Sequence, residues 1–243
     1  MIPRRTALIG GGASGIGFAA AECLAAAGHD LVLAGRRLSR LEKAATSISA
    51  ASVTTVVADL AVDCPPVVTE VDVLVLNAGG PPPGRILQVG DDGWQHAFDL
   101  LLRGPLRLAR AALPAMAGRG FGRVVFVTST AVRQPQPDLA TSVVLRAAVT
   151  SAAKLLSREF ADRGVTVNCV APGPTATERR HEVLAARGGD FAELDAADVA
   201  TVPAGRAARP AEVGAAVAFL ASAAASYVNG TVLTVDGGRT ETP

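Results

Sequence analysis

Ser142 and Arg146 have the residue types and the spacing to act together on a bound oxygen atom. They lie in the stretch TSVVLRAAVTSAAK, residues 141–154, which has the composition of the first turns of a helix. Residues four positions apart share one helix face, so the hydroxyl and the guanidinium are expected to be neighbours. A serine hydroxyl is a very weak acid, and an arginine stays protonated. The pair can therefore bind and polarise an oxygen atom, but it cannot easily supply a proton.

A glycine-rich stretch, GGGASGIG at residues 10–17, predicts a phosphate-binding turn. It follows the apolar run TALIG and precedes an alanine-rich segment, which is the strand-to-helix context that such a turn requires. Glycines allow a pyrophosphate to approach the backbone, and the N-terminus of a helix offers free N–H groups. Two spacings fit, namely GxGxxG and GxxxGxG, and a tight turn without a ligand is the alternative.

Two adjacent arginines follow the next apolar run, in the sequence LAGRR at residues 33–37. In dinucleotide-binding folds an acidic residue at this point holds the ribose 2′-hydroxyl, whereas an arginine accommodates a 2′-phosphate. Gly35 stands in the place of the acid, and Arg36 and Arg37 come directly after it. The pattern favours NADP(H) over NAD(H), and the alternative is a pair of solvated arginines.

The strands and helices that carry these motifs can be expected from the sequence, in which short β-branched runs alternate with alanine- and leucine-rich stretches. Strands are expected at 6–10, 30–35, 53–58, 71–77, 122–129, 164–171 and 230–237, and helices at 15–27, 38–50, 91–117, 141–162 and 210–222. Several of the strands are apolar almost throughout, as strands covered on both faces are. This order predicts one doubly wound α/β domain over residues 1–243, with a parallel sheet of seven strands and helices on both faces.

Two segments depart from the alternation of strands and helices. Residues 59–72 contain Pro65 and Pro66 and are too short for a full crossover helix, so any helix there is expected to be vestigial. Residues 174–206 are polar and alanine-rich, and they follow the carboxyl end of the sixth expected strand. A long segment in that place is expected to form a lid.

Composition and charge narrow the classes of function. The 243 residues carry a net charge of +1, with 49% hydrophobic and 4% aromatic residues, so neither nucleic acid nor an anionic membrane is an expected partner. The three cysteines are far apart in sequence and suggest neither a metal site nor a disulfide framework. With no signal peptide and no apolar run of about 18 residues, a soluble cytoplasmic protein is expected.

Taken together, the motifs from about residue 5 to residue 239 resemble the short-chain dehydrogenase/reductase family, and within it most closely the 3-oxoacyl-carrier-protein reductase-like branch. The matching stretches are GGGASGIG for TGxxxGxG, ADL (58–60), LNAG (76–79) for NNAG, GRVVFVTS (122–129), TVNCVAPGPTAT (166–177) and SYVNGTVLTVDGG (226–238). The resemblance implies a Rossmann-type fold and selects the GxxxGxG spacing, with Gly10 in the usual place of a threonine.

The resemblance also implies a set of residues that bind NADP(H). These are Gly11, Ser14, Gly15, Ile16, Gly17, Arg36, Arg37, Asp59, Leu60, Asn77, Ala78, Gly79, Arg146, Pro172, Gly173, Thr175 and Thr177. The common assembly of the family implies a homodimer or homotetramer. A small-molecule substrate is expected, and no metal.

The catalytic pattern of the family is altered in this chain. The family uses a serine, a tyrosine thirteen positions later, a lysine four further on, and an asparagine on the preceding long helix. Ser129 occupies the serine position, but Ser142 stands in place of the tyrosine, Arg146 in place of the lysine, and Leu101 in place of the asparagine. Ser129, Ser142 and Arg146 remain the candidate catalytic residues, as a cluster that stabilises an oxyanion.

Three functions are compatible with these observations. The first is an oxidoreductase that uses NADP(H) on a carbonyl or an alcohol and receives its proton from water or from another residue. The second is a non-redox enzyme on the same scaffold, such as a cyclase, dehydratase or isomerase, and the third is a catalytically silent nucleotide-binding protein. Arg133 is expected on the substrate side, and Arg179, Arg180 and His181 of the lid could close over an anionic substrate.

Overall fold

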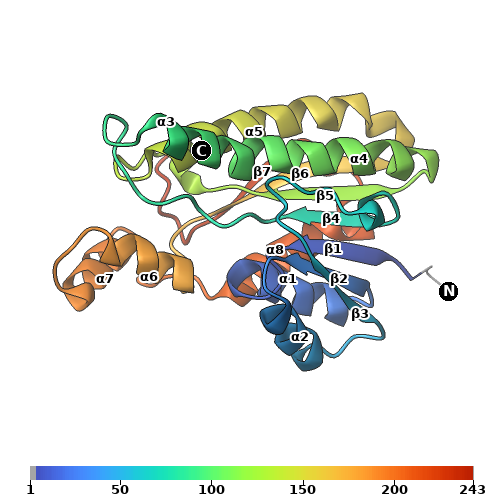
Figure 1. The fold of residues 1–243 in the computed structure, drawn as a ribbon, viewed down its shortest axis with the longest axis horizontal. Helices are drawn as coiled ribbons and strands as arrows, with labels where there is room; N and C mark the ends of the chain where they lie inside the picture. The colour runs from blue at the N-terminus through green and yellow to red at the C-terminus, as the bar shows by residue number, and fades with distance from the viewer. Residues whose placement is uncertain (1–3, 243) are drawn as a thin grey trace.

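The computed structural model describes residues 4–242, and Figure 1 shows its central sheet between two layers of helices. The strands are β1 (Thr6–Gly10), β2 (Asp30–Gly35), β3 (Val53–Val57), β4 (Val73–Leu76), β5 (Gly122–Val127), β6 (Val165–Pro172) and β7 (Val232–Val235). The α-helices are α1 (Gly15–Ala26), α2 (Leu38–Ser47), α3 (Asp91–Phe98), α4 (Gly104–Gly118), α5 (Ala140–Glu159), α6 (Glu178–Ala185), α7 (Phe191–Ala200) and α8 (Pro210–Ala221).

The sheet has seven strands in the order β3-β2-β1-β4-β5-β6-β7, and every neighbouring pair is parallel. This confirms the predicted fold class. The chain moves outward from β1 to β3 and then returns to β4 on the other side of β1, so the crossovers change direction between β1 and β4. Ligands of such sheets bind outside the carboxyl ends of the strands at this point.

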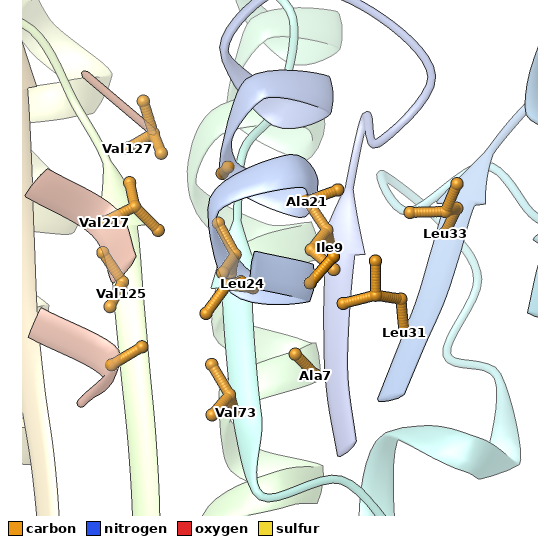
Figure 2. Close-up of a cluster of buried hydrophobic side chains, with 14 of the residues drawn as sticks. Ala7, Ile9, Ala21, Leu24, Leu31, Leu33, Val73, Val125, Val127 and Val217 are labelled. Atoms are coloured by element: carbon orange, nitrogen blue, oxygen red, sulfur yellow. The ribbon is translucent and has the colours of Figure 1, made fainter. Parts of the chain in front are cut away.

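Each face of the sheet carries its own hydrophobic core. On one face, Ile9 and Leu33 of the sheet pack with Leu24 of α1 and Val217 of α8, as Figure 2 shows. On the other face, Phe126 of β5 packs against α4 and α5. Strand residues are buried on both faces, which explains why these strands are apolar throughout rather than alternating.

The helix predicted over 91–117 is present, but a π-helical turn divides it into two α-helices. α3 ends at Phe98, a π-helical turn spans Asp99–Arg103, and α4 begins at Gly104. Pro105 has no N–H to donate to the carbonyl of Leu101 four residues earlier, so the regular α-helical hydrogen bonding cannot continue there.

The two segments that interrupt the alternation of strands and helices, 59–72 and 174–206, differ in how much helix they contain. Within 59–72 the only helix is the 3₁₀ turn Pro66–Thr69, as expected for a vestigial crossover. Residues 174–206 hold α6 and α7, which the sequence pattern did not predict, and both lie beyond the ends of the strands (Figure 1). The extent of a single domain over residues 1–243 stays a prediction, and residues 1–3 and 243 lie outside the described residues.

Two further observations concern membrane segments and the cysteines. No helix between residues 4 and 242 is long and apolar enough to cross a membrane. The cysteines are free, but only Cys169 is buried, and Cys64 is exposed.

Candidate active site

The glycine-rich turn connects β1 to α1 at the carboxyl edge of the sheet. Gly11 and Gly15 have φ angles of 61° and 54°, in the left-handed region that glycine adopts without strain. At Gly17 a β-carbon would overlap the carbonyl oxygen of Gly11. The backbone therefore requires glycine at the three positions of the GxxxGxG spacing, and the turn lies closely against the first turn of α1.

The N-terminus of α1 faces this turn without an acidic residue in its first turn. Ser14 is the N-cap in an extended conformation, and its side chain makes no capping hydrogen bond. The backbone N–H groups of the first turn and the positive end of the helix dipole are thus not neutralised by a carboxylate of the helix. Such an end attracts an anionic group.

Asn77 braces the glycine-rich turn from the end of β4. Its Nδ2 donates to the carbonyl oxygen of Gly10 at 3.2 Å. Leu60 also lies against Gly10, where its Cδ1 would be 3.1 Å, and the Asn77 carbonyl oxygen 3.2 Å, from a β-carbon on that glycine. Asp59, in the loop before it, accepts a hydrogen bond from the Ala61 backbone at 3.1 Å. Asn77 and Leu60 therefore pack against the start of the glycine-rich turn.

Arg36 and Arg37 follow β2 and are exposed. Among the ion pairs of residues 4–242, none involves either arginine. Both guanidiniums are therefore open to a ligand at the carboxyl end of β2, the position that discriminates a 2′-phosphate from a 2′-hydroxyl.

Ser142 and Arg146 are in direct contact on α5. Ser142 is buried, and Arg146 Nε donates to Ser142 Oγ at 3.1 Å. The Arg146 guanidinium also donates to the carbonyl oxygen of Val127 at 2.6 Å and to that of Gly79 at 3.4 Å. Arg146 thereby links α5 to the carboxyl ends of β5 and β4.

The electrostatic surroundings of Arg146 are unusual. Between residues 4 and 242 it has no carboxylate within ion-pair distance, and its partners are a hydroxyl and two backbone carbonyls. Loss of solvent, and secondly the charge of Arg179, lower the pKa of the Arg146 guanidinium to about 10. Arg146 is thus a cation at neutral pH, held near a second cation.

Ser129 stands at the end of β5 but makes its hydrogen bond elsewhere. It is the N-cap of a 3₁₀ turn, Thr130–Val132, and its Oγ accepts from the Ala131 backbone at 3.1 Å. This bond uses the oxygen as an acceptor and leaves the hydroxyl proton to point away from Ala131 N. Both serine hydroxyls accept a hydrogen bond from the protein and retain a proton to donate.

Leu101 lies in the π-helical turn and is only 2% exposed. It packs with Ala97 of α3 and Leu145 of α5 in a small apolar cluster. Position 101 thus has no polar side chain to hold a water molecule. Instead, Leu101 contacts Leu145, the residue directly before Arg146.

The predicted lid segment, 174–206, begins at the carboxyl end of β6. Pro172 ends that strand, Gly173 lies against Asp236, and Thr175 forms a parallel bridge with Ala208. Thr177 caps α6 by accepting from the Arg180 backbone, and its methyl group would be 3.4 Å from a β-carbon on Gly15. The start of the segment therefore lies against the glycine-rich turn.

The three lid residues 179–181 differ in their partners. Arg180 bridges Asp195 and Asp198, and Arg239 binds the same Asp198 at 3.2 Å. His181 stacks on Phe191 with ring centroids 4.7 Å apart. Arg180 and His181 thus join α6 to α7, and only Arg179 turns back toward the loop that follows β4.

Arg179 reaches the loop at residues 79–81. Its guanidinium donates to the carbonyl oxygen of Pro81 at 2.6 Å and to Glu182 at 3.2 Å. A β-carbon on Gly80 would be 2.5 Å from Arg179 Nε, so a glycine is needed for this approach. Sequence reasoning did not predict this role of Gly80. Its only indication in the sequence is its position directly after Gly79 of the LNAG motif.

The described residues offer no metal site. No group of three or more His, Cys, Asp or Glu side chains between residues 4 and 242 is arranged to hold a metal ion. Apart from the Asp59 carboxylate, the polar groups of the predicted site residues are backbone groups, the Asn77 amide, hydroxyls and guanidiniums, whose N–H and O–H donors bind anions and oxygen atoms.

Comparisons with known proteins extend over nearly the whole chain. The family described as "Enoyl-(Acyl carrier protein) reductase" matches residues 11–240. Galactitol 2-dehydrogenase (L-tagatose-forming) of Cereibacter sphaeroides is 35% identical over 96% of this chain and 94% of its own length. The 3-oxoacyl-(acyl-carrier-protein) reductase FabG of Escherichia coli K12 is 32% identical over 96% of both chains. The crystal structure of YwfH, an NADPH-dependent reductase involved in bacilysin biosynthesis, superimposes with a TM-score of 0.93 at 26% identity and covers 99% of this chain and 100% of its own.

Proposed function

The chain belongs to the short-chain dehydrogenase/reductase family, and from this we propose that it is an NADP(H)-dependent oxidoreductase. Its substrate would be a small carbonyl compound or the corresponding alcohol. The observation that carries the proposal is the glycine-rich turn, in which a β-carbon at Gly17 would lie only 2.3 Å from the Gly11 carbonyl oxygen. A backbone this closely packed beside an uncapped helix N-terminus suits a pyrophosphate.

The residues present fit the dinucleotide. Gly11, Gly15 and the N-terminus of α1 would hold the pyrophosphate, and Arg36 and Arg37 would hold a 2′-phosphate. Asp59 and Leu60 would border the adenine, Asn77 to Gly79 would follow the cofactor, and residues 172–177 would surround the nicotinamide. When bound, NADPH supplies a hydride.

The protein's own contribution to the reaction would be to stabilise negative charge on the substrate oxygen. Arg146 Nε donates to Ser142 Oγ, so the Ser142 proton is directed away from Arg146 and toward another acceptor. Ser129 likewise retains a proton to donate, because its oxygen accepts from Ala131. Negative charge that develops on the substrate oxygen during reduction would be stabilised there by these hydroxyls and by the Arg146 charge.

Protonation of that oxygen is the step for which the site is poorly equipped. A serine hydroxyl is too weak an acid, and Arg146 remains a cation at neutral pH. We propose that water supplies the proton to the oxyanion. The enzyme is therefore expected to be slow on simple ketones, because a positioned general acid contributes about 10²–10⁴-fold.

Transfer of a labelled hydride is the direct test of this proposal. The protein is incubated with NADPH deuterated at C4, each C4 epimer in turn, and with a panel of ketones and oxo acids. Deuterium on the former carbonyl carbon of the product, found by mass spectrometry, is the expected result. NADPH binding without deuterium in any product would contradict the proposed oxidoreductase.

Replacing Arg36 and Arg37 together with alanine is expected to weaken NADPH binding by about 10–100-fold, because hydrogen bonds to charged groups contribute about 1.5–3 kcal/mol. NADH binding should change less than twofold, since NADH has no 2′-phosphate. Isothermal titration of both nucleotides measures the difference. Arg158→Ala, an exposed arginine in the last turn of α5, is the control and should leave both affinities unchanged. Equal losses for NADPH and NADH in the double variant would contradict the assignment.

Two observations favour a second candidate, a nucleotide-binding protein or non-redox enzyme without hydride transfer. Leu101 and Leu145 fill the place of a polar relay, and Arg146 is bonded to backbone carbonyls. The labelled-hydride experiment separates this candidate from the first.

The proposal also includes a homodimer or homotetramer in the cytoplasm. The outer face of α5 exposes Val144 and Leu155, and α3, the π-helical turn and α4 border a hollow of about 480 Å³ lined by Phe98, Leu102 and Leu106 with three arginines. Apolar side chains exposed on two neighbouring helices suit an interface between copies of the chain.

A further inference from the structure

We propose that Arg146 and Arg179 together form a binding site for a carboxylate of the substrate, so that the substrate is an oxo acid or the corresponding hydroxy acid. This inference rests on the proposed function, because it names the substrate class of the same site. It concerns Arg179 in particular, which lies outside the nucleotide-binding residues.

The two guanidiniums meet at one short stretch of backbone. Arg146 comes from α5 and donates to the carbonyl oxygen of Gly79, and Arg179 comes from α6 and donates to that of Pro81. These carbonyls belong to residues two positions apart, in the loop that follows β4. Gly80 lies between them, and its lack of a side chain allows Arg179 to lie across the loop.

The charges at this point are not balanced by the protein. Arg146 has no acidic partner between residues 4 and 242, and the only one of Arg179 there is Glu182, whose side chain is 58% exposed. An ion pair so exposed to solvent is weak. Arg180, the next residue in the chain, shows the contrast, since it is 12% exposed and paired with both Asp195 and Asp198.

The electrostatics of Arg146 agree with this geometry. Desolvation and the neighbouring charge of Arg179 lower its pKa to about 10, which means that the two cations repel each other in the absence of a ligand. An anion between them would relieve this repulsion. Holding two like charges together at partial burial costs stability, and a ligand-binding site is a reason for a protein to keep such an arrangement.

The number of charges favours a carboxylate over a phosphate monoester. Two guanidiniums and the carboxylate of Glu182 leave one net positive charge, which a singly charged carboxylate neutralises. An arginine has five N–H donors, of which Arg146 uses three and Arg179 two in hydrogen bonds with described residues. The remaining donors suffice for the two oxygen atoms of a carboxylate.

The site would also orient the substrate for reaction. Arg146 contacts Ser142 directly. A substrate carboxylate bound between Arg146 and Arg179 would therefore lie near the Ser142 hydroxyl, which is proposed to contact the carbonyl oxygen of the substrate. Binding energy from the carboxylate would then hold the carbonyl in place. This offers a compensation for the weak acid at position 142 that a generic ketone cannot use.

The test compares levulinate with methyl levulinate, which differ in the charge of the carboxyl group. Binding to the protein saturated with NADP⁺, and to the protein without nucleotide, is followed by isothermal titration or ligand-observed NMR. Levulinate is expected to bind at least tenfold more tightly than its methyl ester. Inorganic phosphate, as a competitor, is expected to displace it only weakly.

Two variants test the role of Arg179, one by removing its charge and one by displacing its guanidinium. Arg179→Gln removes the charge and is expected to weaken levulinate binding by about 10–100-fold, as for a lost charge-assisted hydrogen bond. Gly80→Ala keeps the charge but displaces the guanidinium, and it should weaken binding by about 5–10-fold. Neither should alter binding of methyl levulinate, the melting temperature by more than a few degrees, or NADP⁺ affinity.

Arg158→Gln is the matched control, because Arg158 is an exposed arginine in the last turn of α5, far along that helix from Arg146, and has no ion-pair partner among the described residues. It should change levulinate binding less than twofold. Equal binding of levulinate and its ester, equal losses in Arg179→Gln and Arg158→Gln, or tighter binding of phosphate would each overturn the inference. Because these are binding measurements, levulinate binding without deuterium transfer would contradict the proposed reaction and leave the carboxylate site standing.

Discussion

Replacing Gly17 with alanine is expected to lower the affinity for NADPH by more than about 100-fold. The added β-carbon would overlap the carbonyl of Gly11, and the atoms involved are backbone, which cannot move aside as the end of a flexible side chain can. The turn must therefore open, and the N–H groups that would hold the pyrophosphate lose their arrangement. Isothermal titration with NADPH measures the loss.

Gly118→Ala is the control for this variant, because Gly118 ends α4 and a β-carbon there would meet no atom within 4 Å. It should bind NADPH as the unchanged protein does. Asn77→Ala is a milder companion that removes only the 3.2 Å hydrogen bond to Gly10 and should cost about tenfold. Full NADPH affinity in a folded Gly17→Ala protein would contradict the assignment of the turn.

Replacing Ser142 with tyrosine and Arg146 with lysine in the same chain is expected to raise kcat/KM for neutral ketones by about 100-fold. A phenol has an ordinary pKa of about 10, which a nearby ammonium lowers toward neutral pH, whereas the serine hydroxyl cannot act as an acid. The two positions lie one turn apart on α5 and already place their side chains in hydrogen-bond contact. Steady-state kinetics with NADPH and a neutral ketone measure the gain.

The two single variants are the controls for this prediction. Ser142→Tyr alone leaves Arg146 bonded to the carbonyl of Val127, and Arg146→Lys alone leaves no phenol, so each should gain less than the pair. Leu101→Asn can be added to restore a polar group in the π-helical turn, at the cost of its contact with Leu145. A folded double variant that binds NADPH and gains nothing would show that positions 142 and 146 are not the main obstacle to ketone reduction.

The predictions from sequence succeeded where the signal was local and repeated. Each buried strand forms a run of apolar residues, and the order of strands and helices admits few topologies, so the seven-stranded parallel sheet could be predicted. The segment 91–117 is helical as predicted, but its π-helical turn was missed, because a proline near Gly104 changes the hydrogen bonding within a continuous helical pattern. α6 and α7 were missed because they bury few residues, Leu184 and Asp198 respectively, and so show no apolar periodicity.

The contact between Ser142 and Arg146 was also predictable, since the spacing of four residues in a helix settles it. Their remaining partners were not predictable. The carbonyl of Val127 lies 19 positions away from Arg146 in the chain, and that of Gly79 lies 67 positions away. These contacts exist only where the carboxyl ends of β4 and β5 meet the first turns of α5.

The sequence by itself determined the family, the glycine-rich turn and the altered pair at 142 and 146, because these are motifs of neighbouring residues. Only the tertiary structure distinguished Arg179 from Arg180. Both are arginines on α6, yet Arg180 turns to the acids of α7 and Arg179 crosses to the carbonyl of Pro81, 98 positions away. A long side chain with several donors can reach many partners, and the folded chain decides which of them are within its reach.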